Sequence, residues 1–131
     1  MTKRTIALLL IIMLLSAMTL SANAVGPQPM YVYAISSYTA LSIPSTTAYC
    51  DGDVTGTLAV NSIGLLMQLQ MKVGSSWYTQ RQWTSTTYSN SAYISGTNAV
   101  SSGEEYRVKV RYSLYTSGGS EVFYRYDYEN S

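Results

Sequence analysis

The chain has 131 residues, with eight basic and seven acidic side chains and no histidine. Because charge is nearly balanced, the composition disfavours a general polyanion binder, nucleic-acid binders included, since such a protein carries an excess of cations. The lack of histidine removes the commonest general base and metal ligand. A serine nucleophile would then need a lysine base, but Lys72 and Lys109, the two lysines beyond the N-terminal leader, are predicted on solvent-facing sides of strands. We therefore expect no enzymatic activity, no metal and no other cofactor.

The first 24 residues have the pattern of a secretory signal peptide. Lys3 and Arg4 precede an apolar run over residues 6–15, and the small-residue site Ala22-Asn23-Ala24 follows. The run is shorter than the roughly 20 residues that span a bilayer. We therefore expect cleavage, no stable membrane span afterwards, and a secreted, extracellular protein.

Cleavage after Ala24 is favoured, and the sequence Val32-Tyr33-Ala34 offers a second candidate site. The expected organisation is a signal-peptide helix over residues 1–24, a flexible N-terminal segment over 25–34 and one domain over 35–131. A domain of this size buries enough surface to fold without a disulfide or a metal.

Beyond the leader, apolar residues alternate with a period of two, and no stretch of ten residues keeps a helical pattern. The clearest strands are Ser62–Val73 and Glu105–Leu114. Weaker strands are predicted near residues 38–43, 48–57, 77–83, 88–94 and 121–129. Seven short strands separated by glycine, serine and proline turns predict an all-β, two-sheet antiparallel β-sandwich.

Cys50 is the only cysteine. Alternation in the stretch AYCDGDV places Tyr49, Asp51 and Asp53 on one strand face and Cys50 on the other. A buried thiol is favoured over an intermolecular link. The two aspartates are interpreted as solvated charges rather than a calcium site, which needs about 6–8 oxygen ligands.

The last two strands are rich in tyrosine, and we predict their pairing from charge. A three-residue loop at Gly118–Ser120 would set Arg111 opposite Asp127 on the outer side. The same register turns three tyrosines of the last strand inward, namely Tyr124, Tyr126 and Tyr128. It leaves Tyr115 and Phe123 as an outward aromatic pair near the hairpin tip.

The stretches YTALSI, TAYCDGDVTG, LQMKVGSSWYTQRQW and VSSGEEYRVKVRYSLYTSG together resemble a family of small secreted proteins of Gram-positive, clostridia-type bacteria that have no characterised function. The resemblance implies a secreted immunoglobulin-like β-sandwich and transfers no catalytic or binding residue. Tyr106, three residues after Gly103, resembles a tyrosine corner of that fold. Cys50 would occupy the place of the first core cysteine, without a second one.

The stretch SSWYTQRQW carries the best candidate surface. Alternation places Trp77, Arg81 and Trp83 on one strand face, which is either core or an outward strip of aromatic rings with a cation between them. With Tyr115 and Phe123, the outward strip would bind a protein or a glycan at a cell surface. The leading function is thus a binding module for such an unidentified partner. The alternative is a structural protein that associates with itself, or with an envelope polymer, through an exposed edge strand.

Overall fold

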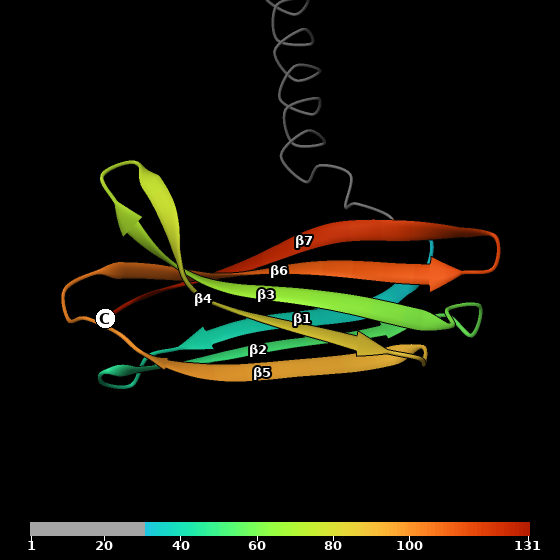
Figure 1. Ribbon diagram of the computed structural model, residues 1–131, viewed down its shortest axis with the longest axis horizontal. Helices are drawn as coiled ribbons and strands as arrows, with labels where there is room; N and C mark the ends of the chain where they lie inside the picture. The colour runs from blue at the N-terminus through green and yellow to red at the C-terminus, as the bar shows by residue number, and fades with distance from the viewer. Residues whose placement is uncertain (1–30) are drawn as a thin grey trace, which may run out of the picture. The chain divides into compact units, whose positions relative to one another are not determined.

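The computed structural model describes residues 31–131, which form seven strands and no helix (Figure 1). The strands are β1 (Ala34–Ser42), β2 (Thr47–Gly56), β3 (Ser62–Val73), β4 (Ser76–Thr87), β5 (Ser91–Ala99), β6 (Glu105–Thr116) and β7 (Gly119–Asn130). They build two antiparallel sheets, β1-β2-β5 and β4-β3-β6-β7. The predicted all-β architecture of seven strands in two sheets is confirmed. The expected signal peptide lies outside the described residues, as does most of the segment over 25–34.

None of the described residues forms a helix long and apolar enough to cross a membrane.

The core lies between the two sheets and is built from the alternating positions of the central strands. Every second residue of β6 from Tyr106 to Leu114 is buried, and so is every second residue of β3 from Ile63 to Leu69. Cys50 is buried on the inner face of β2, as predicted. Because alternation decides the face of each residue in a regular strand, these strands follow directly from the sequence.

The two buried tyrosines of β6 have hydrogen-bonded hydroxyls. Tyr112 donates to the carbonyl of Tyr38 at 2.8 Å and accepts from Thr39 Oγ1 at 2.6 Å. Tyr106 accepts from the backbone N–H of Ser101 at 2.9 Å, which is the geometry of a tyrosine corner. Buried polar groups without partners are costly. Both hydroxyls avoid this cost because they form hydrogen bonds with neighbouring segments of the chain.

The β6–β7 hairpin differs from the predicted pairing. Its loop is the two residues Ser117 and Gly118 rather than three, and Tyr112 pairs with Phe123 instead of Tyr126. The pairing is therefore shifted by three residues. Because this shift is odd, it exchanges the two faces of β7, and the predicted register is wrong.

The corrected register turns the tyrosines of β7 outward. Tyr124 lies opposite Arg111, where Asp127 was expected, and its ring is 46% exposed. Arg125 and Asp127 lie on the inner side, opposite Val110 and Val108. Charge pairing across the hairpin therefore does not set this register.

Inward charges on β7 are tolerated because β7 is a sheet edge and faces the edge of the other sheet. The carboxylate of Asp127 accepts the backbone N–H of Leu41 at 2.8 Å. The carboxylate of Glu121 accepts the N–H groups of Val32 at 2.6 Å and Ala34 at 3.1 Å. These charge-assisted bonds use donors that an edge strand otherwise leaves unpaired. The two carboxylates thus close the sandwich along β1.

A bulge in β4 alters the opposite side of the molecule. Leu69 pairs with Arg81 and Gln70 pairs with Thr79, so Gln80 is the extra residue. Past this point the tip of the β3–β4 hairpin bends away from the sandwich (Figure 1). Val73, at the end of β3, is 52% exposed there.

The β1 edge can be tested with Asp127→Ala, which leaves the N–H of the buried residue Leu41 without its acceptor. We expect the free energy of unfolding to fall by about 1–3 kcal/mol in urea denaturation. Glu129→Ala, a change at an exposed carboxylate of the same strand, should alter it by less than about 0.5 kcal/mol. Equal effects of the two changes would contradict the edge contact.

Candidate functional site

The outer surface of the four-stranded sheet gathers cations, aromatic rings and amides, and we call it the basic face. Its side chains come from alternate positions of each strand. The central row on β6 is Arg107, Lys109 and Arg111. The β7 row is Tyr124, Tyr126 and Tyr128. On the other side of β6 the face continues through Leu66, Gln68 and Gln70 of β3 and Trp77, Thr79 and Gln82 of β4.

Arg107 is the most constrained cation of this face. Its Nε donates to Gln70 Oε1 at 2.7 Å. Its guanidinium carbon lies 4.4 Å from the centre of the Trp77 ring and 5.0 Å from that of Tyr126. Trp77 also meets the edge of Tyr128, with ring centres 5.8 Å apart. The guanidinium is therefore held in position before any ligand arrives.

Lys109, the next cation along β6, repeats this arrangement of a cation beside a ring. Lys109 Nζ lies 5.1 Å from the centre of the Tyr124 ring. Gln68 donates to Gln82 at 2.9 Å, and Gln70 donates to Thr79 at 3.2 Å. These hydrogen bonds fix the positions of the glutamine side chains beside the cations.

Carboxylates are scarce on the basic face. Within residues 31–131 the single ion pair joins Lys72 to Glu105 at 3.6 Å, at one end of the face. Glu121 and Asp127 are engaged with β1 on the inner side. Arg107, Lys109 and Arg111 thus stand two residues apart along β6 without a carboxylate partner in the described part of the chain. Like charges this close repel each other, and an anion would relieve that repulsion.

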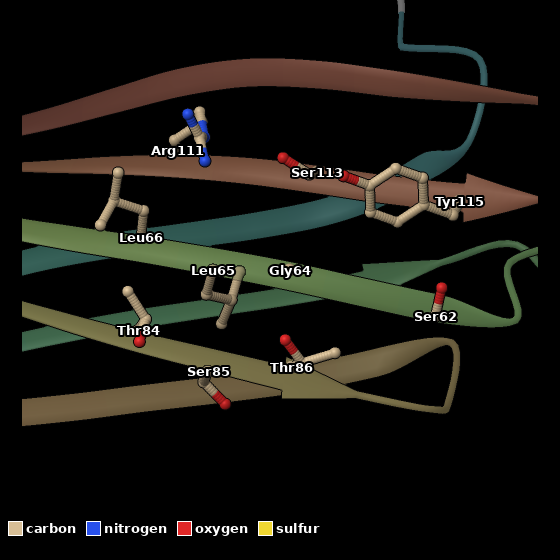
Figure 2. A pocket seen from close by; sticks show the side chains of 10 residues that line it. All are labelled: Ser62, Gly64, Leu65, Leu66, Thr84, Ser85, Thr86, Arg111, Ser113 and Tyr115. Carbon is tan, nitrogen blue, oxygen red and sulfur yellow. The ribbon is translucent and has the colours of Figure 1, made fainter.

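A shallow hollow of about 270 Å³ indents the face beside Gly64. Its lining includes Leu66, Arg111 and Tyr115 on β3 and β6, and Thr84 and Thr86 on β4 (Figure 2). The absence of a side chain at Gly64 leaves the space open. The hollow continues the row of cations and hydroxyls toward the end of β6.

The structure separates the residues that the sequence grouped as one strip. The bulge at Gln80 reverses the alternation, so Trp77 faces outward while Arg81 and Trp83 are on the inner side, opposite Leu69 and Met67. The prediction of a common face is therefore wrong.

Trp83 packs against the core, and its indole lies against Gly96 of β5. A Cβ at Gly96 would overlap its indole ring, so the glycine makes room for the tryptophan. Arg81 lies beside this indole, 5.8 Å from the ring centre, and remains exposed. Trp83 thus serves packing, and Trp77 alone joins the basic face.

The predicted outward pair of Tyr115 and Phe123 is also separated. Tyr115 lies on the basic face, whereas Phe123 is 7% exposed and stacks on Tyr112 with ring centres 5.0 Å apart. The tyrosines of β7 were missed because the hairpin register was wrong. Alternation in β6 alone had already placed the three cations outward.

A scan against family models and a search of curated proteins find no match. Among solved structures, OgpA from Akkermansia muciniphila has 10% identity and a TM-score of 0.45, over 79% of this chain and 29% of that one. Spo0M, a sporulation control protein from Bacillus subtilis, has 14% identity and a TM-score of 0.39, over 76% and 48%. The chain thus spans less than half the length of either protein. Likenesses this distant carry no inference about function.

Cys50 is the one thiol of the chain, and its environment makes it a poor nucleophile. Its side chain is 1% exposed. Burial, with a smaller contribution from the Asp51 carboxylate, raises the pKa of the thiol from 9.0 to about 12. The reactive thiolate is therefore absent at neutral pH.

We expect native protein to resist thiol reagents at about pH 8 and to react promptly in denaturant, as followed by mass spectrometry. Between pH 9.0 and about 12 the unfolded thiol ionises while the folded one keeps its proton. The free energy of unfolding should therefore fall as pH rises through this window, and less steeply in Cys50→Ala. Rapid labelling of native protein would contradict the buried position.

Proposed function

We propose that this chain is a secreted, non-enzymatic binding module that recognises an acidic glycan at a cell surface through its basic face. The observation that carries the proposal is the row Arg107, Lys109 and Arg111, which lies between aromatic rings and has no carboxylate partner in the described residues. Cations bind carboxylate or sulfate groups of a sugar polymer. Ring faces beside them offer apolar contact to sugar C–H groups.

The chemistry of the face favours a glycan over a protein as its tightly bound partner. Protein interfaces have an apolar centre that is depleted of charge. Here the centre is charged, and its surroundings are hydroxyls and amides, with Trp77 and Leu66 as the main apolar groups. Tyr126 and Tyr128 are 41% and 52% exposed and stack on each other, with ring centres 6.4 Å apart. A flat, polar and aromatic surface of this kind suits an extended sugar chain.

The proposal includes an immunoglobulin-like form of the sandwich. If the strands are lettered A, B, C, C′, E, F and G in chain order, the sheets read A-B-E and C′-C-F-G, close to the immunoglobulin arrangement. The tyrosine corner at Tyr106, on the strand lettered F, supports the same assignment. Secretion rests on the signal-peptide pattern and on the resemblance to a secreted family.

The alternative of association through an exposed edge strand receives less support. Carboxylates of β7 already occupy N–H groups along the β1 edge. A strand added there would have to displace charge-assisted hydrogen bonds. This edge is therefore protected against pairing.

The experiment is calorimetric titration of the purified chain with polygalacturonate, dextran sulfate and neutral dextran. We expect binding of an acidic polymer that weakens with salt, and none of neutral dextran. Arg107→Ala combined with Lys109→Ala should lower the affinity at least tenfold, or about 1.4 kcal/mol.

Arg81→Ala is the matched control, because it removes a cation that lies outside the basic face. The affinity of this variant for the acidic polymer should stay within about twofold of that of the unchanged protein, a change of well under 1 kcal/mol. Trp77→Ala should weaken binding, because it removes a ring from the face. Equal binding of neutral and acidic polymers, or full affinity in the double variant, would overturn the proposal.

A further inference from the structure

The outer surface of the three-stranded sheet has the opposite chemistry, and we call it the acidic face. Three exposed tyrosines lie on it: Tyr38, Tyr49 and Tyr93 are 64%, 48% and 60% exposed. Asp51 and Asp53 stand between them on the central strand β2. The other outward positions in the paired parts of β1, β2 and β5 are alanine, serine and threonine, so these three strands place no cation on this face.

The acidic face is ordered around its carboxylates. Tyr93 donates its hydroxyl hydrogen to Asp51 Oδ1 at 2.9 Å. A shallow hollow of about 420 Å³ lies alongside, and its lining includes Tyr49, Asp51, Tyr93, Ser95 and Thr97. A positively charged side chain entering this hollow would meet a carboxylate and two ring faces.

The spacing of charges on the two faces matches. Asp51 and Asp53 are two residues apart on one strand, as are Lys109 and Arg111 on β6. Same-face neighbours in a strand lie about 6.6–6.8 Å apart. Two consecutive carboxylates of one molecule can therefore meet two consecutive cations of another. In that arrangement the tyrosines beside the two carboxylates contact the tyrosines beside the two cations.

We propose that the acidic face of one copy of this chain docks on the basic face of a second copy. Opposite charge, equal spacing and exposed aromatic rings carry the assignment of a second copy as the occupant. The two surfaces differ, so the contact is head-to-tail and leaves a free face at each end. Repetition then produces chains of molecules rather than a closed dimer.

The size of the faces predicts a weak contact. Three strands about 4.8 Å apart and some 30 Å long present a flat area of only about 430 Å². Stable interfaces bury about 800 Å² on each partner. Association is therefore concentration-dependent, and salt weakens it because both faces are exposed to solvent.

Self-association and the proposed glycan binding would compete, because both use the cations of β6. The docking does not depend on which polymer the basic face binds, and it adds the carboxylates of β2, which the glycan proposal does not use. A change at Asp51 and Asp53 therefore separates the two proposals. It should abolish docking and leave binding of an acidic polymer intact.

The experiment is sedimentation velocity of the purified chain from low micromolar concentration to about 1 mM, which covers weak interfaces. We expect the weight-average sedimentation coefficient to rise with concentration at low salt and to stay flat in Asp51→Asn with Asp53→Asn. Glu104→Gln with Glu129→Gln removes the same number of charges outside both faces and should keep the rise. A concentration-independent monomer, or an unchanged rise in the Asp51→Asn, Asp53→Asn variant, would overturn the proposal.

A charge exchange gives the complementary result. Asp51→Lys with Asp53→Lys makes both faces positive, and Lys109→Glu with Arg111→Glu makes both negative. Each variant should sediment as a monomer by itself, and an equimolar mixture should associate. Circular dichroism verifies that both are folded. Folded variants that fail to associate in the mixture would contradict the head-to-tail contact.

Discussion

The contact between the β7 carboxylates and the edge of β1 determines much of the rest of the structure. Glu121 and Asp127 face inward and accept backbone N–H groups that have no strand partner. Arg125, between them, donates to Ser37 Oγ at 3.1 Å. Charged groups that would be costly in an apolar core are satisfied here because they reach the border of the other sheet. The chain closes its sandwich on this side with side chains rather than with another strand.

This contact also determines what the surface displays. Once the charged positions of β7 turn toward β1, the alternating tyrosines must turn outward and lie beside the cations of β6. The carboxylates used along the β1 edge are unavailable to neutralise Arg107, Lys109 and Arg111. A nearly neutral protein thus has one basic face and, across the core, one acidic face. Both proposals rest on this separation of charge rather than on the net charge.

The sequence predicts the parts of the fold that depend on regular alternation. The inward residues of β6, the buried Cys50 and the outward Asp51 follow from the period of two, because regular strands allow no other assignment. The bulge at Gln80 has no clear sequence signal, and one extra residue was enough to place Trp77 and Trp83 on opposite faces. The signal peptide, secretion and the resemblance to a family of small secreted proteins stay predictions.

The hairpin register was wrong for a different physical reason. Arg125 and Asp127 are unfavourable as inward residues if the apolar core is their only environment, because an unpaired charge is costly there. Their partners are the side-chain hydroxyl of Ser37 and the backbone N–H of Leu41, in a strand more than eighty residues earlier. A contact so distant in the chain lies beyond any local comparison of cross-strand pairs. The outward tyrosines could be found only once both sheet edges were in place.

The most direct measurement is the pattern of cross-strand nuclear Overhauser effects between α-protons of β6 and β7. The account predicts contacts that follow the pairing of Tyr112 with Phe123 and Arg111 with Tyr124. Contacts that link Tyr112 to Tyr126 would return the tyrosines to the core and the carboxylates to solvent. That result would contradict the β1 edge contact and remove the aromatic row of β7 from the basic face.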